Sequence, residues 1–134
     1  MAYFLLKTEP TSFSLDDLEK QKRTVWDGVR NALALKHLRA MKKGDSAFIY
    51  HTGDEKQVVG IAKVAGNPYP EPKMKDVRYL VVDIVFDVKL KNPVPLAAIK
   101  ARRDLKDFPL VRLSRLSVMP VTEEEWETIL AMSK

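Results

Sequence analysis

The sequence predicts an α+β fold organised around a small antiparallel barrel or a strongly curved sheet, with short helices interspersed. Three observations support this class. Short strand-like segments mostly follow one another, residues 80–90 alternate between apolar and polar side chains, and strong helix-start signals lie between some of the strands. Alternation with a period of two is typical of a half-buried strand, and successive strands that pair with one another form curved antiparallel sheets.

The strands are predicted from apolar runs and from the residues that interrupt them. The first strand stops before Pro10, because proline cannot continue a central ladder. The longest alternates from Leu80 to Leu90, with only Val85 breaking the polar face. Three prolines within 67–72 predict an irregular loop. The predicted strands are residues 2–7, 25–26, 45–51, 58–64, 80–90 and 116–119.

The helices are predicted from their caps. Ser14 is a good N-cap before an acidic first turn, and Thr122 with Glu125 forms a capping box. Val121 is then placed to pack on Trp126, which assigns this tryptophan to the structure. A helix over residues 29–41, capped by Asp27 and ended by Gly44, and a short one over 96–101 complete the set.

Length and composition limit the classes of protein. A chain of 134 residues is predicted to form one domain, spanning 1–134. Cysteine is absent and only two histidines are present, so we expect no disulfide, metal or cofactor. The N-terminus lacks the features of a signal peptide, and no apolar run approaches a membrane span. We therefore expect a soluble, cytoplasmic monomer.

The basic residues are unevenly distributed. The net charge is +5, but residues 122–134 hold four acids and one base, so the remainder carries +8. Residues 20–43 contain eight bases and one acid, and residues 100–115 contain six bases and two acids. Such basic segments favour a polyanionic partner such as nucleic acid, although the same residues could simply keep the surface solvated.

Four segments mix aromatic and polar residues in a way that a core would not require. They are Lys7–Pro10, Trp26–Asn31, Tyr50–Thr52 and Arg115–Ser117, and most lie at predicted strand ends. Ends of strands and the loops after them are where barrels place binding sites.

In the second segment, the indole of Trp26 and the side chains of Arg30 and Asn31 could stack on a flat ring and bond to its edge. The alternative is a capped helix beside a buried tryptophan. The other candidates have structural alternatives too: Tyr50 as a core residue, His51 as a hydrogen-bonded structural histidine, and Glu9 as an acceptor for nearby amides.

Taken together and in order, these segments resemble the signature blocks of the EVE domain family, a member of the PUA-like superfamily. The blocks are residues 3–10, 26–31, 48–52 and 115–121, and the resemblance covers essentially the whole chain. It implies a PUA-like pseudo-barrel flanked by helices, with a pocket for a modified base, usually a modified cytosine, flipped out of DNA or RNA. Phe4 stands where family members commonly have tryptophan, and the segment between Tyr69 and Tyr79 is short.

The resemblance places the base pocket on Lys7, Thr8, Glu9, Trp26, Asp27, Arg30, Asn31, Tyr50, His51, Thr52, Arg115 and Ser117. From the charge pattern we expect phosphate contacts at Lys36, Arg39, Lys42, Lys43, Arg102 and Arg103. The sequence thus predicts a non-catalytic reader of a modified base. Two alternatives stay open: an enzyme acting on a modified nucleotide or nucleic acid, with Lys7, Glu9, Asp27 or His51 as acid or base, and a small-molecule or protein-interaction module.

Overall fold

The computed structural model describes residues 1–134, in which seven strands form one curved sheet with the order β2-β6-β4-β3-β1-β7, and β5 pairs with β6. All pairs are antiparallel except β1 with β3. The elements are β1 (Tyr3–Thr8), α1 (Leu15–Gln21), β2 (Arg23–Trp26), α2 (Ala32–Arg39), β3 (Ser46–His51), β4 (Gln57–Val64), β5 (Tyr69–Pro70), β6 (Leu80–Pro95), α3 (Leu96–Lys100), the 3-10 turn η1 (Arg103–Leu105), α4 (Pro109–Arg112), β7 (Val118–Val121) and α5 (Glu123–Met132).

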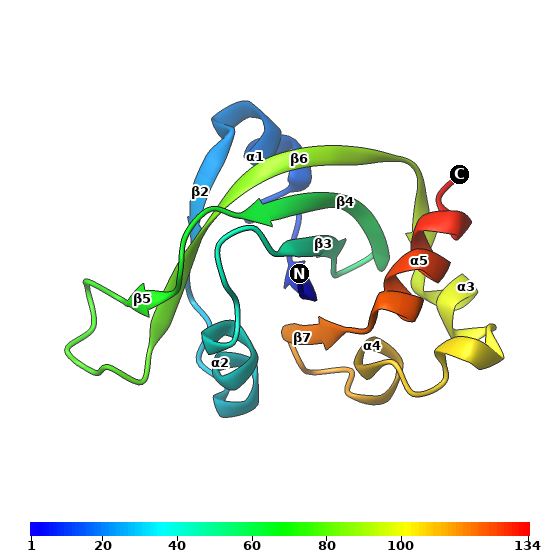
Figure 1. Cartoon of the computed structure of the whole chain (residues 1–134). Coiled ribbons are helices and arrows are strands. Elements are labelled where there is room, and N and C mark those ends of the chain that lie inside the picture. The colour runs from blue at the N-terminus through cyan, green and yellow to red at the C-terminus, as the bar shows by residue number, and fades with distance from the viewer.

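The sheet curves because its central pairs contain irregularities. The register shifts once between β3 and β4 and twice between β4 and β6, and such bulges increase strand twist. Gly60 lets Leu15 and the backbone of β6 pack directly against β4, since a Cβ at Gly60 would lie 2.5 Å from a Leu15 methyl group and 2.8 Å from the Val88 carbonyl oxygen. Figure 1 shows β6 as a long curved strand that runs from the side of α2 to the side of α5. The predicted α+β class, a mostly antiparallel curved sheet with short helices, is confirmed.

Two strands form the ends of this open barrel, β2 on one side and β7 on the other. Helix α2 contacts both β7 and β6, so it covers the gap between the two ends. Figure 1 shows α2 below the sheet in this position. The segment that leads from Trp26 to α2 therefore crosses the open side of the barrel.

The parallel pair of β1 and β3 sets where the site can form. Lys7 lies opposite Tyr50 and Thr8 opposite His51, so both strands end at the same rim. Two of the four segments that mix aromatic and polar residues are thereby brought side by side.

The core supports the structural role predicted for Trp126. Its ring stacks on Phe48 at a centroid distance of 3.8 Å and on Tyr3 at 4.5 Å. The capping box is present, because the Thr122 hydroxyl accepts from the Glu125 amide and the Glu125 carboxylate accepts from the Thr122 amide. Phe86, which the alternation assigns to the core, is only half-buried against it.

Several predicted boundaries are wrong. The helix expected over 29–41 begins at Ala32, and its N-cap is Asn31 rather than Asp27. Gly28 adopts a positive φ of 78°, outside the helical region, which delays the helix.

The long strand also departs from its predicted pattern. It continues to Pro95, and Val88 is 42% exposed because the register shift opposite Ile61 and Ala62 breaks the alternation. The last strand lies at 118–121 instead of 116–119, β5 forms within the expected loop, and η1 and α4 were not predicted. Among the helices, none has the length and apolar character needed to cross a bilayer.

Candidate nucleic-acid interface

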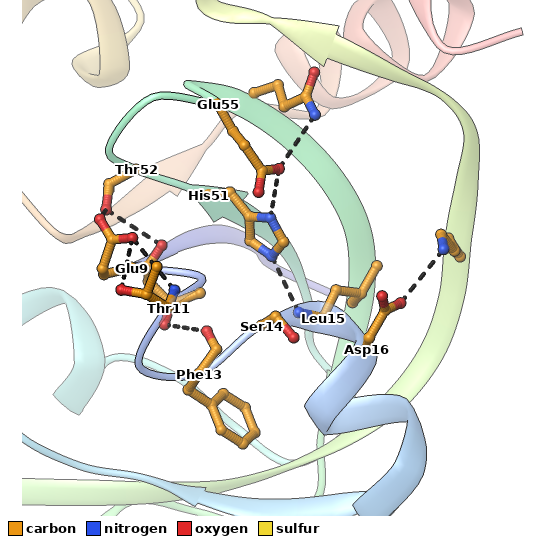
Figure 2. A network of polar contacts seen from close by, with 12 residues as sticks. Glu9, Thr11, Phe13, Ser14, Leu15, Asp16, His51, Thr52 and Glu55 are labelled. Atoms are coloured by element: carbon orange, nitrogen blue, oxygen red, sulfur yellow. Dashed lines mark hydrogen bonds and ion pairs between the residues drawn. The ribbon is translucent and has the colours of Figure 1, made fainter.

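The rim where β1 and β3 end is shaped by a tight turn after Thr8. The backbone carbonyl of Glu9 accepts from the amides of Ser12 and Phe13, both at 2.9 Å. The Thr8 hydroxyl donates to the Phe13 carbonyl oxygen at 2.7 Å. These bonds fold the chain back on itself, which turns the Phe13 ring towards the sheet (Figure 2).

A pocket of about 460 Å³ opens beside this turn, within the volume range of small-ligand sites. We call it the indole pocket; its lining residues are Lys7, Thr8, Glu9, Phe13, Gln21, Thr24, Val25, Trp26 and Asp27. Trp26 is 8% exposed and meets Phe13 edge to face, with a centroid distance of 6.1 Å. The indole is thus mostly packed into the core, yet it contributes to an open cavity.

The carboxylate of Glu9 is held by the two strand ends. Its Oε1 accepts from the amide of Thr11 at 3.3 Å and from the Thr11 hydroxyl at 3.2 Å, while its Oε2 accepts from the Thr52 hydroxyl at 3.3 Å. Figure 2 shows this carboxylate between the two segments. An ionised carboxylate has about four acceptor sites, so Glu9 retains capacity for a ligand that donates.

His51 has a structural role, the alternative that the sequence also offered. It lines none of the cavities described in this section. Its Nε2 accepts from the Leu15 amide at the start of α1, at 3.0 Å. Because Nε2 must then be unprotonated, Nδ1 carries the hydrogen and donates to Glu55 Oε1 at 2.9 Å (Figure 2). This hydrogen bond from His51 is the main cause that lowers the pKa of Glu55.

Lys7 forms the boundary between the indole pocket and a second cavity of about 290 Å³. We call this cavity the lysine hollow; it is lined by Lys7, Tyr50, Thr52, Gly53, Lys56, Leu96, Lys100, Leu110, Val111 and Ser114. The Lys7 ammonium donates to the Ser114 carbonyl oxygen at 2.8 Å and lies 5.8 Å from the centroid of the Tyr50 ring. Burial lowers the pKa of Lys7 and raises that of Tyr50.

The other residues predicted for the base pocket lie outside the indole pocket. Asn31 and Arg115 line a third cavity of about 360 Å³ together with Leu33, Arg112, Leu113, Ser114 and Leu116, which we call the arginine hollow. The side-chain oxygen of Asn31 accepts from the Ala34 amide at 3.0 Å as the N-cap of α2. Ser114 lines both the lysine hollow and the arginine hollow, so the three cavities adjoin in series.

Two further candidates contribute in other ways. Arg30 lies over the Tyr79 ring at 5.0 Å and donates to the Val29 carbonyl. Ser117 is half-buried, and its backbone carbonyl accepts from the Lys7 amide at 3.0 Å. The structure therefore brings together Lys7, Thr8, Glu9, Trp26 and Asp27, with Tyr50 and Thr52 next to them, and separates Arg30, Asn31, His51, Arg115 and Ser117 from that pocket.

The predicted phosphate contacts do not surround the indole pocket. Lys42 and Lys43 precede the start of β3, at the end of the β1–β3 pair opposite to Lys7 and Thr8. A strand of this length spans roughly 17 Å, so these lysines lie far from the pocket. Arg102 pairs with Asp104 at 2.8 Å, and neighbouring Arg103 is exposed. Lys36 and Arg39 are exposed on α2.

Sequence reasoning missed several of the residues that line the cavities. Phe13, Gln21 and Thr24 line the indole pocket, and Lys56 and Lys100 line the lysine hollow. Phe13 had a local signal, because it precedes the N-cap Ser14, but that signal indicates only packing. The placement of Lys56 and Lys100 depends on contacts between distant segments.

Comparison with known proteins supports one family. The model of the EVE domain matches residues 2–132. Thymocyte nuclear protein 1 from human is 32% identical over 167 residues, covering 99% of this chain and 74% of the relative, and the mouse protein is 35% identical over 166 residues. These alignments are longer than the chain, so the relatives carry residues that this chain lacks.

Solved structures give the same result. A protein from Rhodopseudomonas palustris has a TM-score of 0.94 at 44% identity, over 99% of this chain and 93% of that one. The structure of human THYN1 in complex with 5-methylcytosine-containing DNA has a TM-score of 0.92 at 32% identity, over 100% of this chain and 98% of that one. An ASCH protein from Zymomonas mobilis, at 14% identity and a TM-score of 0.63, shares the fold. The chain belongs to the EVE domain family.

Proposed function

We propose that this EVE domain binds DNA and holds one modified base, a modified cytosine, in the indole pocket after the base has flipped out of the helix. The proposal includes no chemical conversion of the base. It is supported by the family and by the human relative, whose structure is that of a complex with DNA containing 5-methylcytosine.

The observation that carries the proposal is the composition of the indole pocket. Its lining combines two aromatic rings, Trp26 and Phe13, with polar side chains that include those of Lys7, Thr8 and Glu9. A flipped base loses stacking worth a few kcal/mol, and contact with an aromatic ring restores about 1–3 kcal/mol. The exocyclic amine of cytosine donates hydrogen bonds, and a carboxylate such as that of Glu9 is a suitable acceptor.

The geometry also favours binding over catalysis. An acid or base must have a titratable atom directed at the substrate, and both ring nitrogens of His51 are engaged with Leu15 and Glu55. Lys7 and Glu9 line the pocket, but the hydroxyls that donate to Glu9 belong to Thr11 and Thr52, which do not line it. The Thr8 hydroxyl, which does line it, donates to a backbone carbonyl.

Binding of short duplexes that contain cytosine, 5-methylcytosine or 5-hydroxymethylcytosine at one position tests the proposal. Wild-type protein is expected to prefer a modified duplex. Glu9→Gln should weaken binding of the modified duplex by about tenfold, because a charge-assisted hydrogen bond contributes about 1.5–3 kcal/mol. Equal affinity for all duplexes, unchanged in Glu9→Gln, would remove the reader proposal.

The aromatic wall needs a conservative substitution. Trp26 is nearly buried, and truncation to alanine would destabilise the fold by about 3–5 kcal/mol. Trp26→Phe keeps a ring in the core and should weaken binding of the flipped base. Its matched control is Trp126→Phe. Trp126 is also an indole of the core, but it lines none of the three cavities.

Analysis of the nucleosides after incubation tests whether the protein converts the modified base. Modified oligonucleotide incubated with the protein and then digested to nucleosides should contain the same nucleosides as oligonucleotide incubated alone. A new nucleoside, or loss of the modified one, that disappears in Glu9→Gln would establish an enzyme instead.

Contacts to phosphates farther along the duplex remain part of the proposal. The proposed contacts are the exposed Lys36 and Arg39 of α2 and the exposed Arg103. Lys42 and Lys43 lie at the end of the β1–β3 pair opposite to the pocket, and Arg102 is already paired with Asp104. Affinity should fall with salt in proportion to the number of such contacts.

A further inference from the structure

The lysine hollow combines cationic and apolar residues without an acid in its lining. Its cations are Lys7, Lys56 and Lys100. The apolar residues are Leu96, Leu110 and Val111, and the hydroxyls are those of Tyr50, Thr52 and Ser114. Glu9 lies against Gly53 at the edge of this hollow, but its carboxylate belongs to the lining of the indole pocket.

The three lysines come from separate parts of the fold. Lys7 is near the end of β1, Lys56 precedes β4, and Lys100 is the last residue of α3. Lys56 and Lys100 are exposed, and like charges that line one cavity repel one another, so an anion between them would relieve the repulsion. Apolar walls reduce screening by water, which strengthens both the repulsion and the attraction for an anion.

Lys7 is oriented for such a role. One of its three N–H groups donates to the Ser114 carbonyl oxygen at 2.8 Å, which fixes the ammonium between the two cavities. The lowered pKa of Lys7 reflects its burial, and no carboxylate is hydrogen-bonded to its ammonium group. The other two N–H groups are left for a ligand.

Lys56 has an unusual backbone. Its φ is 46°, in the left-handed region that residues other than glycine seldom adopt. The conformation is held by its carbonyl oxygen, which accepts from the Leu96 amide at 2.8 Å. This bond ties Lys56 to the start of α3, the helix that ends in Lys100, so two of the lysines are positioned by one hydrogen-bonded connection.

We propose that the lysine hollow binds a backbone phosphate next to the flipped nucleotide, between Lys7, Lys56 and Lys100. This inference rests on the proposed function, because it takes the base in the indole pocket as the neighbour of that phosphate. Since Lys7 lines both cavities, a nucleotide in the indole pocket has its sugar-phosphate link within reach of the hollow. The hollow holds the strand in position and does not read the base.

The test compares two double variants that remove the same charge. Lys56→Gln with Lys100→Gln removes two lysines from the hollow. Lys91→Gln with Lys134→Gln removes two exposed lysines that line none of the three cavities and lie near each other, since the Asn92 amide donates to the Ser133 carbonyl. Affinity for modified and unmodified duplexes is measured over a series of salt concentrations. Single Lys100→Gln is included because it leaves the strained backbone at Lys56 untouched.

We expect the hollow variant to weaken binding to modified and unmodified duplexes alike. The slope of log affinity against log salt should become shallower by up to about 1 for the double variant, since one phosphate loses its contacts, and by less for Lys100→Gln. The preference for the modified duplex should stay as in wild type. The control variant should change the salt slope less than the hollow variant does, for the modified and the unmodified duplex alike.

Two results would overturn the inference. Equal affinities and salt slopes in the hollow variant and the control variant would show that the hollow contacts no phosphate. A changed base preference with an unchanged salt slope would show that the hollow receives a neighbouring base on Leu96 and Val111. Failure of the proposed function gives a different result, namely no base preference in wild type while the two double variants still differ in salt slope.

Discussion

The carboxylate of Glu9 lies directly against the backbone of Gly53. A Cβ on Gly53 would come within 2.6 Å of Glu9 Oε2, and Gly53 has a positive φ of 75°. The glycine therefore both permits the turn after β3 and leaves the space that the carboxylate occupies.

Gly53→Ala is expected to displace Glu9 and weaken binding of the modified duplex by about tenfold, the effect of losing one charge-assisted hydrogen bond. The strained φ should also lower the free energy of unfolding by about 1–2 kcal/mol. Gly44→Ala is the matched control, because Gly44 has a φ of 96° and no atom near its Cβ position. It should lose similar stability and keep its affinity for the modified duplex; an equal loss of affinity in both variants would contradict the role of Gly53.

The N-cap of α2 is Asn31 and not Asp27, and the two residues should differ in their effect on stability. Asn31→Ala removes the acceptor for the Ala34 amide and should lower the free energy of unfolding by about 1 kcal/mol. Asp27→Ala should leave the stability of α2 unchanged, because Asp27 caps no helix and lines the indole pocket. Denaturant unfolding and hydrogen exchange at Ala34 measure both. Faster exchange at Ala34 in Asp27→Ala would show that Asp27 caps α2, as the sequence suggested.

Lys7 predicts a pH dependence of stability. Burial holds its pKa below the ordinary value of 10.5 in the folded protein. Between the lowered value and 10.5 the unfolded chain binds more protons than the native protein, so the free energy of unfolding gains a contribution as pH rises. This contribution should be present in wild type and absent in Lys7→Met. Denaturant unfolding from neutral pH to about pH 10.5 measures the difference between the two proteins, with exposed Lys91→Met as control; parallel curves for wild type and Lys7→Met would refute the prediction.

Substitution of His51 should lower the stability of the protein, although His51 lines none of the three cavities. His51→Phe keeps a ring but removes the acceptor for the buried Leu15 amide, and an unpaired buried amide costs about 1–3 kcal/mol. Glu55→Gln should cost less, because its partner bond to His51 lies at a side chain that is 43% exposed. Unfolding by denaturant gives both values. If the glutamine variant is the less stable of the two, the assignment of the main contact to Leu15 is wrong.

The parts of the fold that depend on local rules were predictable from the sequence. The capping box of Thr122 and Glu125 involves residues three positions apart and is present, and Trp126, assigned to the structure from the same local pattern, is buried. The rim residues Lys7, Thr8 and Glu9 were also identifiable, because polar residues directly after an apolar strand have few structural reasons to be there.

Other parts depend on contacts that local rules do not contain. Asp27 and Asn31 are both good capping residues, and the choice between them follows from the positive φ of Gly28. The acceptor role of His51 depends on Leu15, which is 36 positions away in the sequence. Lys56 and Lys100 approach Lys7 only once the β1–β3 rim and α3 are assembled, so the charge pattern alone directed attention to Lys42 and Lys43 instead.

The shared direction of β1 and β3 has a consequence for how recognition can diversify. The loops that follow Thr8 and His51 leave the sheet at a common edge, while the packing that stabilises the barrel lies behind them. Exchange of these two loops would change the chemistry offered to a ligand and leave the scaffold untouched. The domain is thus suited to loop grafting, in which one framework is given new ligand preferences.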